Sequence, residues 1–229
     1  MSVKAIVMDI EGTTTSIDFV TSVLFPYAAM HLKKYINNNY MHNKSVQDIL
    51  EKIREEIGEP SANIDNLTNM LLDWIDQDKK ITALKDLQGL MWEAGYKQGD
   101  FTGHLYPDVV EMLPKWQDRN IDLYIFSSGS IKAQKLLFQF SDFGDLTGLI
   151  KGYFDTNIGH KRDPKAYRKI AESIGLSTAE ILFLSDTPEE LDAAQKSNML
   201  TTLLIRGDQL KKPQCHPVVN QFKQIALGA

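Results

Sequence analysis

The sequence predicts an α/β fold, in which a parallel sheet flanked by helices carries an inserted all-helical segment. From residue 107 onward, short apolar runs alternate with segments of helical periodicity, a pattern typical of parallel sheets with helices on both faces. Between about residues 17 and 99, apolar residues recur at helical spacing instead. The 229 residues, 43% of them hydrophobic, are enough for one such domain and a smaller insert.

The first expected strand is the apolar run at residues 5–8. Three groups of apolar residues then predict helices, with loop signals at residues 58–60 and 99–100. These groups are Ile49, Ile53 and Ile57; Leu67, Leu71, Leu72 and Ile75; and Leu84, Leu87, Leu90 and Met91. The alternating part begins with a helix at Pro107. It continues with a strand at 123–126, a helix at 133–140, a strand at 152–154, a helix at 165–174, a strand at 181–184, a helix at 189–197 and a strand at 201–205.

Two carboxylates, Asp9 and Glu11, follow the first expected strand. This is the end of the strand at which open α/β sheets bind ligands. Residues two apart in a strand point to opposite faces, but a turn at Gly12 can bring both side chains to one site. On this segment alone, a solvated acidic turn and a catalytic site are equally favoured.

Three later segments add polar residues at comparable places. LYIFSSGS ends an apolar run in serines, GHKRDP places a lysine in a loop before a helix start, and ILFLSDTPEE ends a strand in an aspartate. Each segment alone is weak evidence, because a serine turn is usually only a turn, a loop lysine is usually solvated, and an acid before a proline is usually a helix cap. Right-handed crossovers would bring the three strand ends, with Asp9, Ser127 and Asp186, to one edge of the sheet.

In this order, the four segments resemble the four motifs of the haloacid dehalogenase-like phosphohydrolases, which lie on a Rossmann-like sheet. The resemblance implies that Asp9 is the nucleophile, Ser127 binds phosphate, Lys161 is the lysine of the third motif and Asp186 binds a metal. It also implies that the helical insert is a cap domain. We therefore expect a core domain of residues 1–17 and 104–229 and a helical cap domain of residues 18–103.

The resemblance is closer to one branch of that family. Glu11 stands where most of these phosphatases carry aspartate, and DIEGTTTSIDFV, LFPYA and GHLYPDV are similar to segments of the enolase-phosphatases of methionine salvage. This implies enolisation and dephosphorylation of 2,3-diketo-5-methylthiopentyl-1-phosphate to an acireductone. The alternatives are a phosphatase for another small phosphate monoester, and a non-catalytic scaffold that would be expected to lack one of the four motif residues.

The residues suit phosphoryl transfer. Asp9 would attack phosphorus and form an aspartyl-phosphate, while Lys161 keeps Asp9 ionised. Mg²⁺ would be held by Asp9 and Asp186, and the resemblance implies the backbone carbonyl of Glu11 as a further ligand. Ser127 would bind the transferring oxygens, with Ser128 as a further candidate contact. Glu11 is the expected general acid and base. It or a cap residue would be the enolisation base.

Glu190 has several possible roles. It could hold a metal-bound water, fix Lys161, or be one of the acids that are favourable in the first turn of a helix.

Composition excludes other classes of protein. A net charge of −5 gives no support for nucleic-acid binding, and the single Cys215 fits a reducing compartment. No signal peptide or membrane-spanning segment is apparent, so a soluble, cytoplasmic protein without membrane contact is expected. The expected partner is a small-molecule phosphate ester, and nothing in the sequence requires more than a monomer.

Overall fold

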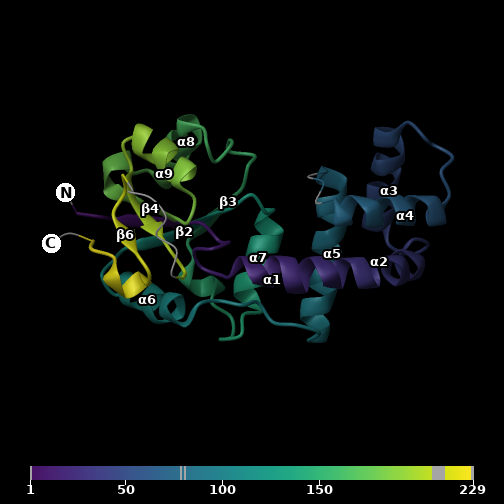
Figure 1. Cartoon of the computed structure of the whole chain (residues 1–229), viewed down its shortest axis with the longest axis horizontal. Coiled ribbons are helices and arrows are strands. Elements are labelled where there is room, and N and C mark those ends of the chain that lie inside the picture. The colour runs from purple at the N-terminus through teal and green to yellow at the C-terminus, as the bar shows by residue number, and fades with distance from the viewer. Residues whose placement is uncertain (1, 78, 80, 208–214, 228–229) are drawn as a thin grey trace. The chain divides into compact units, whose positions relative to one another are not determined.

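The computed structural model describes residues 2–77, 79, 81–207 and 215–227. The chain divides into two compact units (Figure 1): one comprises Met1–Ile17 and Thr102–Ala229, and the other comprises Asp18–Phe101. The first unit is a helix-flanked parallel sheet and the second is helical, which confirms the predicted fold class.

The sheet of the first unit consists of parallel strands in the order β3-β2-β1-β4-β5-β6. These are β1 (Ala5–Met8), β2 (Asp122–Phe126), β3 (Gly152–Phe154), β4 (Ile181–Ser185), β5 (Leu200–Leu204) and β6 (Val218–Val219). The first strand in sequence, β1, is central because it pairs with β2 on one side and β4 on the other. All four of its residues are buried, as expected for a strand that is covered on both faces.

Helices cover both faces of this sheet. They are α6 (Pro107–Gln117), α7 (Ile131–Gln139), α8 (Pro164–Ile174) and α9 (Pro188–Lys196), with short 3₁₀ turns at Thr147–Leu149, Thr178–Glu180 and Phe222–Gln224. Figure 1 shows α8 and α9 on one side of the sheet and α6 on the other. Ala5 and Val7 belong to the core with α8 and α9, so the alternation of β1 leaves Ile6 and Met8 for the opposite face.

The helical unit has a hydrophobic core of its own. After α1 (Ile17–Phe19) and a π-helical turn at Val20–Leu24, it consists of α2 (Phe25–Asn39), α3 (Lys44–Ile57), α4 (Ile64–Asp76) and α5 (Thr82–Gln98). Asn43 and Asn63 cap α3 and α4 by accepting backbone N–H bonds, and α3 and α5 end at the predicted loop signals, Gly58 and Gly99. Among the helices of the described residues, none is both long enough and apolar enough to span a membrane.

The C-terminal segment contributes more to the first unit than the sequence indicated. Val218 and Val219 extend the sheet beyond β5, and Phe222 is fully buried and stacks on Trp116 of α6. The predicted series of strands stopped at residue 205. A two-residue strand next to Pro217 is too short to show an apolar period, which explains the omission.

Candidate active site

The polar residues expected at the strand ends do lie at neighbouring strand ends. Asp9 follows β1, Ser127 follows β2, and Asp186 follows β4. The backbone N–H of Asp9 donates to the carbonyl of Leu184 at 2.9 Å, which holds the ends of β1 and β4 in register. The chain reverses its direction of winding between β1 and β4, and ligands bind at such points in open α/β sheets.

A tight turn after β1 places Glu11. The carbonyl of Ile10 accepts the N–H groups of Thr13, Thr14 and Thr15 at 2.9–3.1 Å, and Thr14 Oγ1 lies 3.2 Å from the carbonyls of both Asp9 and Ile10. The turn therefore ends the strand alternation. As a result, Ser127 Oγ donates to Glu11 Oε2 at 3.2 Å, so the second acid faces the end of β2.

Gly12 allows the ends of β1 and β4 to approach closely. Its φ is 73°, and a Cβ at this position would lie only 2.0 Å from Asp186 Oδ2. Any other residue would therefore displace the Asp186 carboxylate and strain the backbone. The Asp186 carboxylate therefore lies close to Gly12.

Lys161 is the cation of this cluster. Its side chain is 8% exposed, and Nζ lies 2.5 Å from Asp9 Oδ1 and 2.6 Å from Glu190 Oε2. Tyr167 of α8 donates to the Lys161 carbonyl at 2.6 Å, which fixes the loop backbone. Ser185 Oγ donates to the same Glu190 oxygen at 3.1 Å. Of the roles left open for Glu190, this geometry matches contact with Lys161.

The site has more negative than positive groups. Burial, and then the charge of Asp9, raises the pKa of Glu11 and of Asp186. The same two causes raise the pKa of Glu190 to about 7, in spite of the adjacent Lys161. Burial alone would lower the pKa of Lys161, but the charges of Asp9 and Glu190 raise it above its usual value. Among the described residues of this cluster, Lys161 is the one cation beside four carboxyl groups, those of Asp9, Glu11, Asp186 and Glu190.

A hard cation fits this donor set. The carboxylates of Asp9 and Asp186 and the carbonyl of Glu11 are oxygen ligands, which Mg²⁺ prefers. Within the described ranges, no group of three or more His, Cys, Asp or Glu side chains is arranged to hold a metal. The expected set contains only two such side chains, because its third protein ligand is a backbone oxygen.

The serine turn after β2 is built around Ser127. This residue is fully buried, and its Oγ accepts the N–H of Gly129 at 3.2 Å, whereas Ser128 is exposed. Gln134 donates to the carbonyls of Gly129 and Phe154, which holds the turn against β3. Gln134, Tyr167 and Ser185 were not predicted, since a buried polar contact to a backbone carbonyl or a neighbouring acid leaves no pattern in the sequence.

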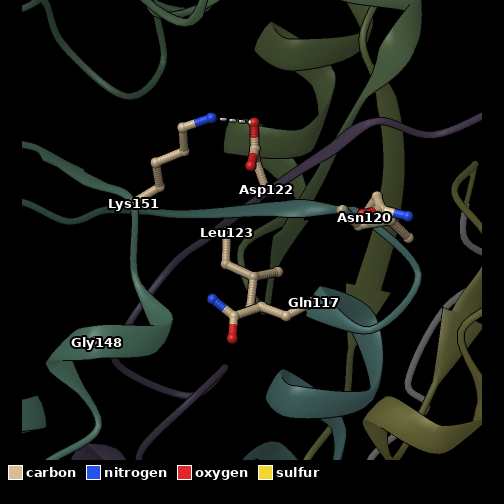
Figure 2. A pocket seen from close by; sticks show the side chains of 7 residues that line it. Gln117, Asn120, Asp122, Leu123, Gly148 and Lys151 are labelled. Atoms are coloured by element: carbon tan, nitrogen blue, oxygen red, sulfur yellow. Dashed lines mark hydrogen bonds and ion pairs between the residues drawn. The ribbon is translucent and has the colours of Figure 1, made fainter.

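A hollow of about 450 Å³ lies elsewhere on this unit (Figure 2). It includes Asp122 and Leu123 at the start of β2, so it is at the opposite end of the strand from Ser127. Lys151 and Asp122 in it are joined by an ion pair of 2.6 Å. None of the residues proposed from the sequence lines this hollow.

Glu190→Gln is expected to change how stability depends on pH. Because the folded pKa of Glu190 is raised from 4.5 to about 7, the folded protein binds more protons than the unfolded chain in that range. The contribution of Glu190 to the free energy of unfolding is therefore fully present below pH 4.5 and is lost as the pH rises through 7. The free energy of unfolding of the wild type minus that of the variant should fall over this range. Urea denaturation with EDTA at each pH measures it, and a constant difference would contradict the assignment.

Comparison with known proteins agrees with the fold. One unit has a parallel sheet with an acidic cluster at its strand ends, and the helical unit is inserted after β1. These features fit a class of hydrolases. The haloacid dehalogenase-like hydrolase family matches residues 3–198 of the chain. Enolase-phosphatase E1 of Enterobacter sp. (strain 638) is 51% identical over 97% of this chain and 96% of the relative. Enolase-phosphatase E1 of Yersinia pestis (strain Pestoides F) is 48% identical over 99% of this chain and 98% of the relative. The chain therefore belongs to the enolase-phosphatase E1 family of the haloacid dehalogenase-like hydrolases.

Solved structures show the same fold. The UTR4 protein of Saccharomyces cerevisiae is 33% identical, with a TM-score of 0.83 over 97% of this chain and all of that one. A dehalogenase with 20% identity has a TM-score of 0.57 over 97% of this chain, a likeness of fold alone.

Proposed function

We propose that this chain enolises 2,3-diketo-5-methylthiopentyl-1-phosphate and then removes its phosphate, giving the acireductone 1,2-dihydroxy-3-keto-5-methylthiopentene of methionine salvage. The observation that carries the proposal is the buried cluster in which Lys161 bonds Asp9 while Glu11 bonds Ser127. The two carboxylates thus have different partners, a lysine for Asp9 and a serine for Glu11, and the pKa of Glu11 is raised, as a general acid requires.

In the phosphatase step, Asp9 Oδ attacks phosphorus and the bond from phosphorus to the ester oxygen breaks. The carboxyl of Glu11 donates its proton to that oxygen, and the raised pKa favours the protonated form needed for this. Water then attacks the aspartyl-phosphate while Glu11 takes a proton from it, and inorganic phosphate leaves with Asp9 restored. Ser127 and Lys161 bind the transferring oxygens, with Ser128 as a further candidate contact.

Mg²⁺ is the proposed cofactor. Asp9, Asp186 and the Glu11 carbonyl would hold it, and it would supply charge neutralisation between the carboxylates and the phosphoryl group. The excess of acids over Lys161 and the approach of Asp186 to Gly12 support this placement.

Enolisation requires a base that removes a proton from carbon. It also requires a cation or a hydrogen-bond donor at the carbonyl oxygen. Glu11 and a side chain of the helical unit are the two candidates for the base. Glu11 is favoured because its raised pKa makes it a stronger base than an ordinary glutamate. A monomer in the cytoplasm remains the prediction for the state of the protein.

Turnover of the diketone ester tests this function. We expect acireductone and phosphate to form together with Mg²⁺, to stop with excess EDTA, and to resume when Mg²⁺ is restored. Sugar phosphates and phosphoglycolate should react at least about 100-fold more slowly. Ultraviolet absorbance follows the acireductone, and a colorimetric assay follows phosphate. Rapid hydrolysis of sugar phosphates with no reaction of the diketone ester would favour the alternative, a phosphatase for another small monoester.

A further inference from the structure

Residues outside the reacting cluster hold the turn that carries Glu11. Arg206, which follows β5, donates from Nε and Nη2 to the Thr13 carbonyl at 3.1 and 2.7 Å. The N–H of Tyr106 donates to the Thr14 carbonyl at 3.0 Å. His104 Nδ1 lies 3.0 Å from Thr15 Oγ1 and accepts the N–H of Ser16 at 3.2 Å. Four consecutive residues, 13–16, are thus fixed by partners distant in sequence.

Arg206 is itself fixed on several sides. Its Nη1 contacts both carboxylate oxygens of Asp108, at 2.9 and 2.8 Å, and its guanidinium lies 4.2 Å from the centre of the Tyr106 ring and 5.1 Å from that of Phe222. Asp108 Oδ2 also accepts the N–H of Phe222 at 2.7 Å. The Arg206 side chain is only 8% exposed. The planar guanidinium of Arg206, bound in this way, is held in one position, whereas the amine of a lysine would be flexible.

The turn depends on these backbone contacts. The hydroxyl of Thr13 is buried and has no hydrogen-bond partner within the described residues, so its side chain does not anchor the turn. Thr13 is coupled to Glu11 because its N–H closes the turn on Ile10, and the N–H of Gly12 donates to the Thr15 carbonyl at 2.8 Å. A shift of the Thr13 carbonyl therefore moves the residue that reaches Ser127.

We propose that Arg206 is a positioning residue for phosphate release, acting through the turn at residues 10–15 to keep the Glu11 carboxyl beside Ser127 and the leaving oxygen. The inference rests on the proposed function of Glu11 as the acid. It also gives a role to the segment GHLYPDV, since His104, Tyr106 and Asp108 of that segment form the rest of the support.

Leaving-group dependence distinguishes positioning from general weakening of the fold. Phenyl phosphate needs a proton on its leaving oxygen, whereas p-nitrophenyl phosphate, similar in shape, departs as a stabilised phenolate. Displacement of Glu11 should therefore slow the first ester much more than the second. A loss of folded protein would slow both equally.

The experiment compares Arg206→Lys with Arg54→Lys in the Mg²⁺-loaded, full-length enzyme. Arg54 is a matched control, because it too is a buried arginine that bonds a backbone carbonyl, of Ala62, and a carboxylate, of Glu51, but it lies in the helical unit. For Arg206→Lys we expect kcat on phenyl phosphate to fall at least about 10-fold more than on p-nitrophenyl phosphate. For Arg54→Lys both should change by the same factor. Thermal denaturation shows that each variant is folded at the assay temperature.

Equal losses on the two aryl phosphates, or an unchanged kcat, would overturn the role of Arg206. Failure of the wild type to convert the diketone ester would instead contradict the proposed function, while the ratio of the two aryl phosphates would still decide the role of Arg206. A ratio that changes in Arg206→Lys but not in Arg54→Lys supports the inference.

Discussion

Asp9→Asn is expected to lower the rate of phosphate release by about 10⁴-fold or more, since it removes the nucleophile of a covalent mechanism while keeping its shape. The fold should persist. Asp9 raises the pKa of Glu11, Asp186 and Glu190, so its neutralisation relieves repulsion in the cluster. Lys161 keeps its bond to Glu190.

Two measurements check this result. Steady-state phosphate release gives the loss of rate, and acid quenching with labelled phosphate ester should trap label on the wild-type protein but none on the variant. Asp122→Asn, at the opposite end of β2, is the matched control and should keep full activity. A folded Asp9→Asn enzyme with more than a tenth of the wild-type rate would exclude Asp9 as the nucleophile.

Lys161→Met is expected to be the most destabilising single change at the site. It leaves Asp9 and Glu190 buried without their cation, and breaking a buried ion pair costs about 3–5 kcal/mol. The loss should be greater at pH 8 than at pH 5, because Glu190, whose pKa is raised to about 7, can take up a proton as the pH falls. Phosphate release should fall by at least about 10²–10³-fold, the cost of one preorganised group that stabilises developing charge.

Lys151→Met provides the comparison. Lys151 pairs with Asp122 at a similar distance of 2.6 Å, but the two side chains are 59% and 41% exposed. Solvent screens an exposed pair, so this variant should lose little stability and no activity. Urea denaturation at the two pH values measures both variants. Equal losses of stability in the two would show that Lys161 is not the central cation of the cluster.

The fold class was predictable because its signals are local. Each strand from β1 to β5 is a short apolar run followed by a polar turn, and the switch to helical spacing after residue 17 marks the inserted unit. The short strand β6 was not predictable, because Val218 and Val219 form it only by pairing with β5.

The site was predictable in part. Asp9, Ser127 and Asp186 could be placed together because parallel strands bring their ends to one edge. The contact of Lys161 with Glu190 was one of several roles left open for that acid, and the contact of Arg206 with Thr13 was not predicted. Lys161 and Arg206 lie outside the strands, so sheet topology does not specify what their side chains reach, and the contacts depend on tertiary packing.

The central place of β1 has a consequence for biosynthesis. This strand is synthesised before its neighbours β2 and β4, which begin at residues 122 and 181, so it has no sheet partner until residue 122 has emerged from the ribosome. The helical unit between them has its own core and can condense earlier. Asp9 cannot meet its cation before residue 161 has emerged, and a nascent chain that stops earlier lacks the lysine that contacts Asp9.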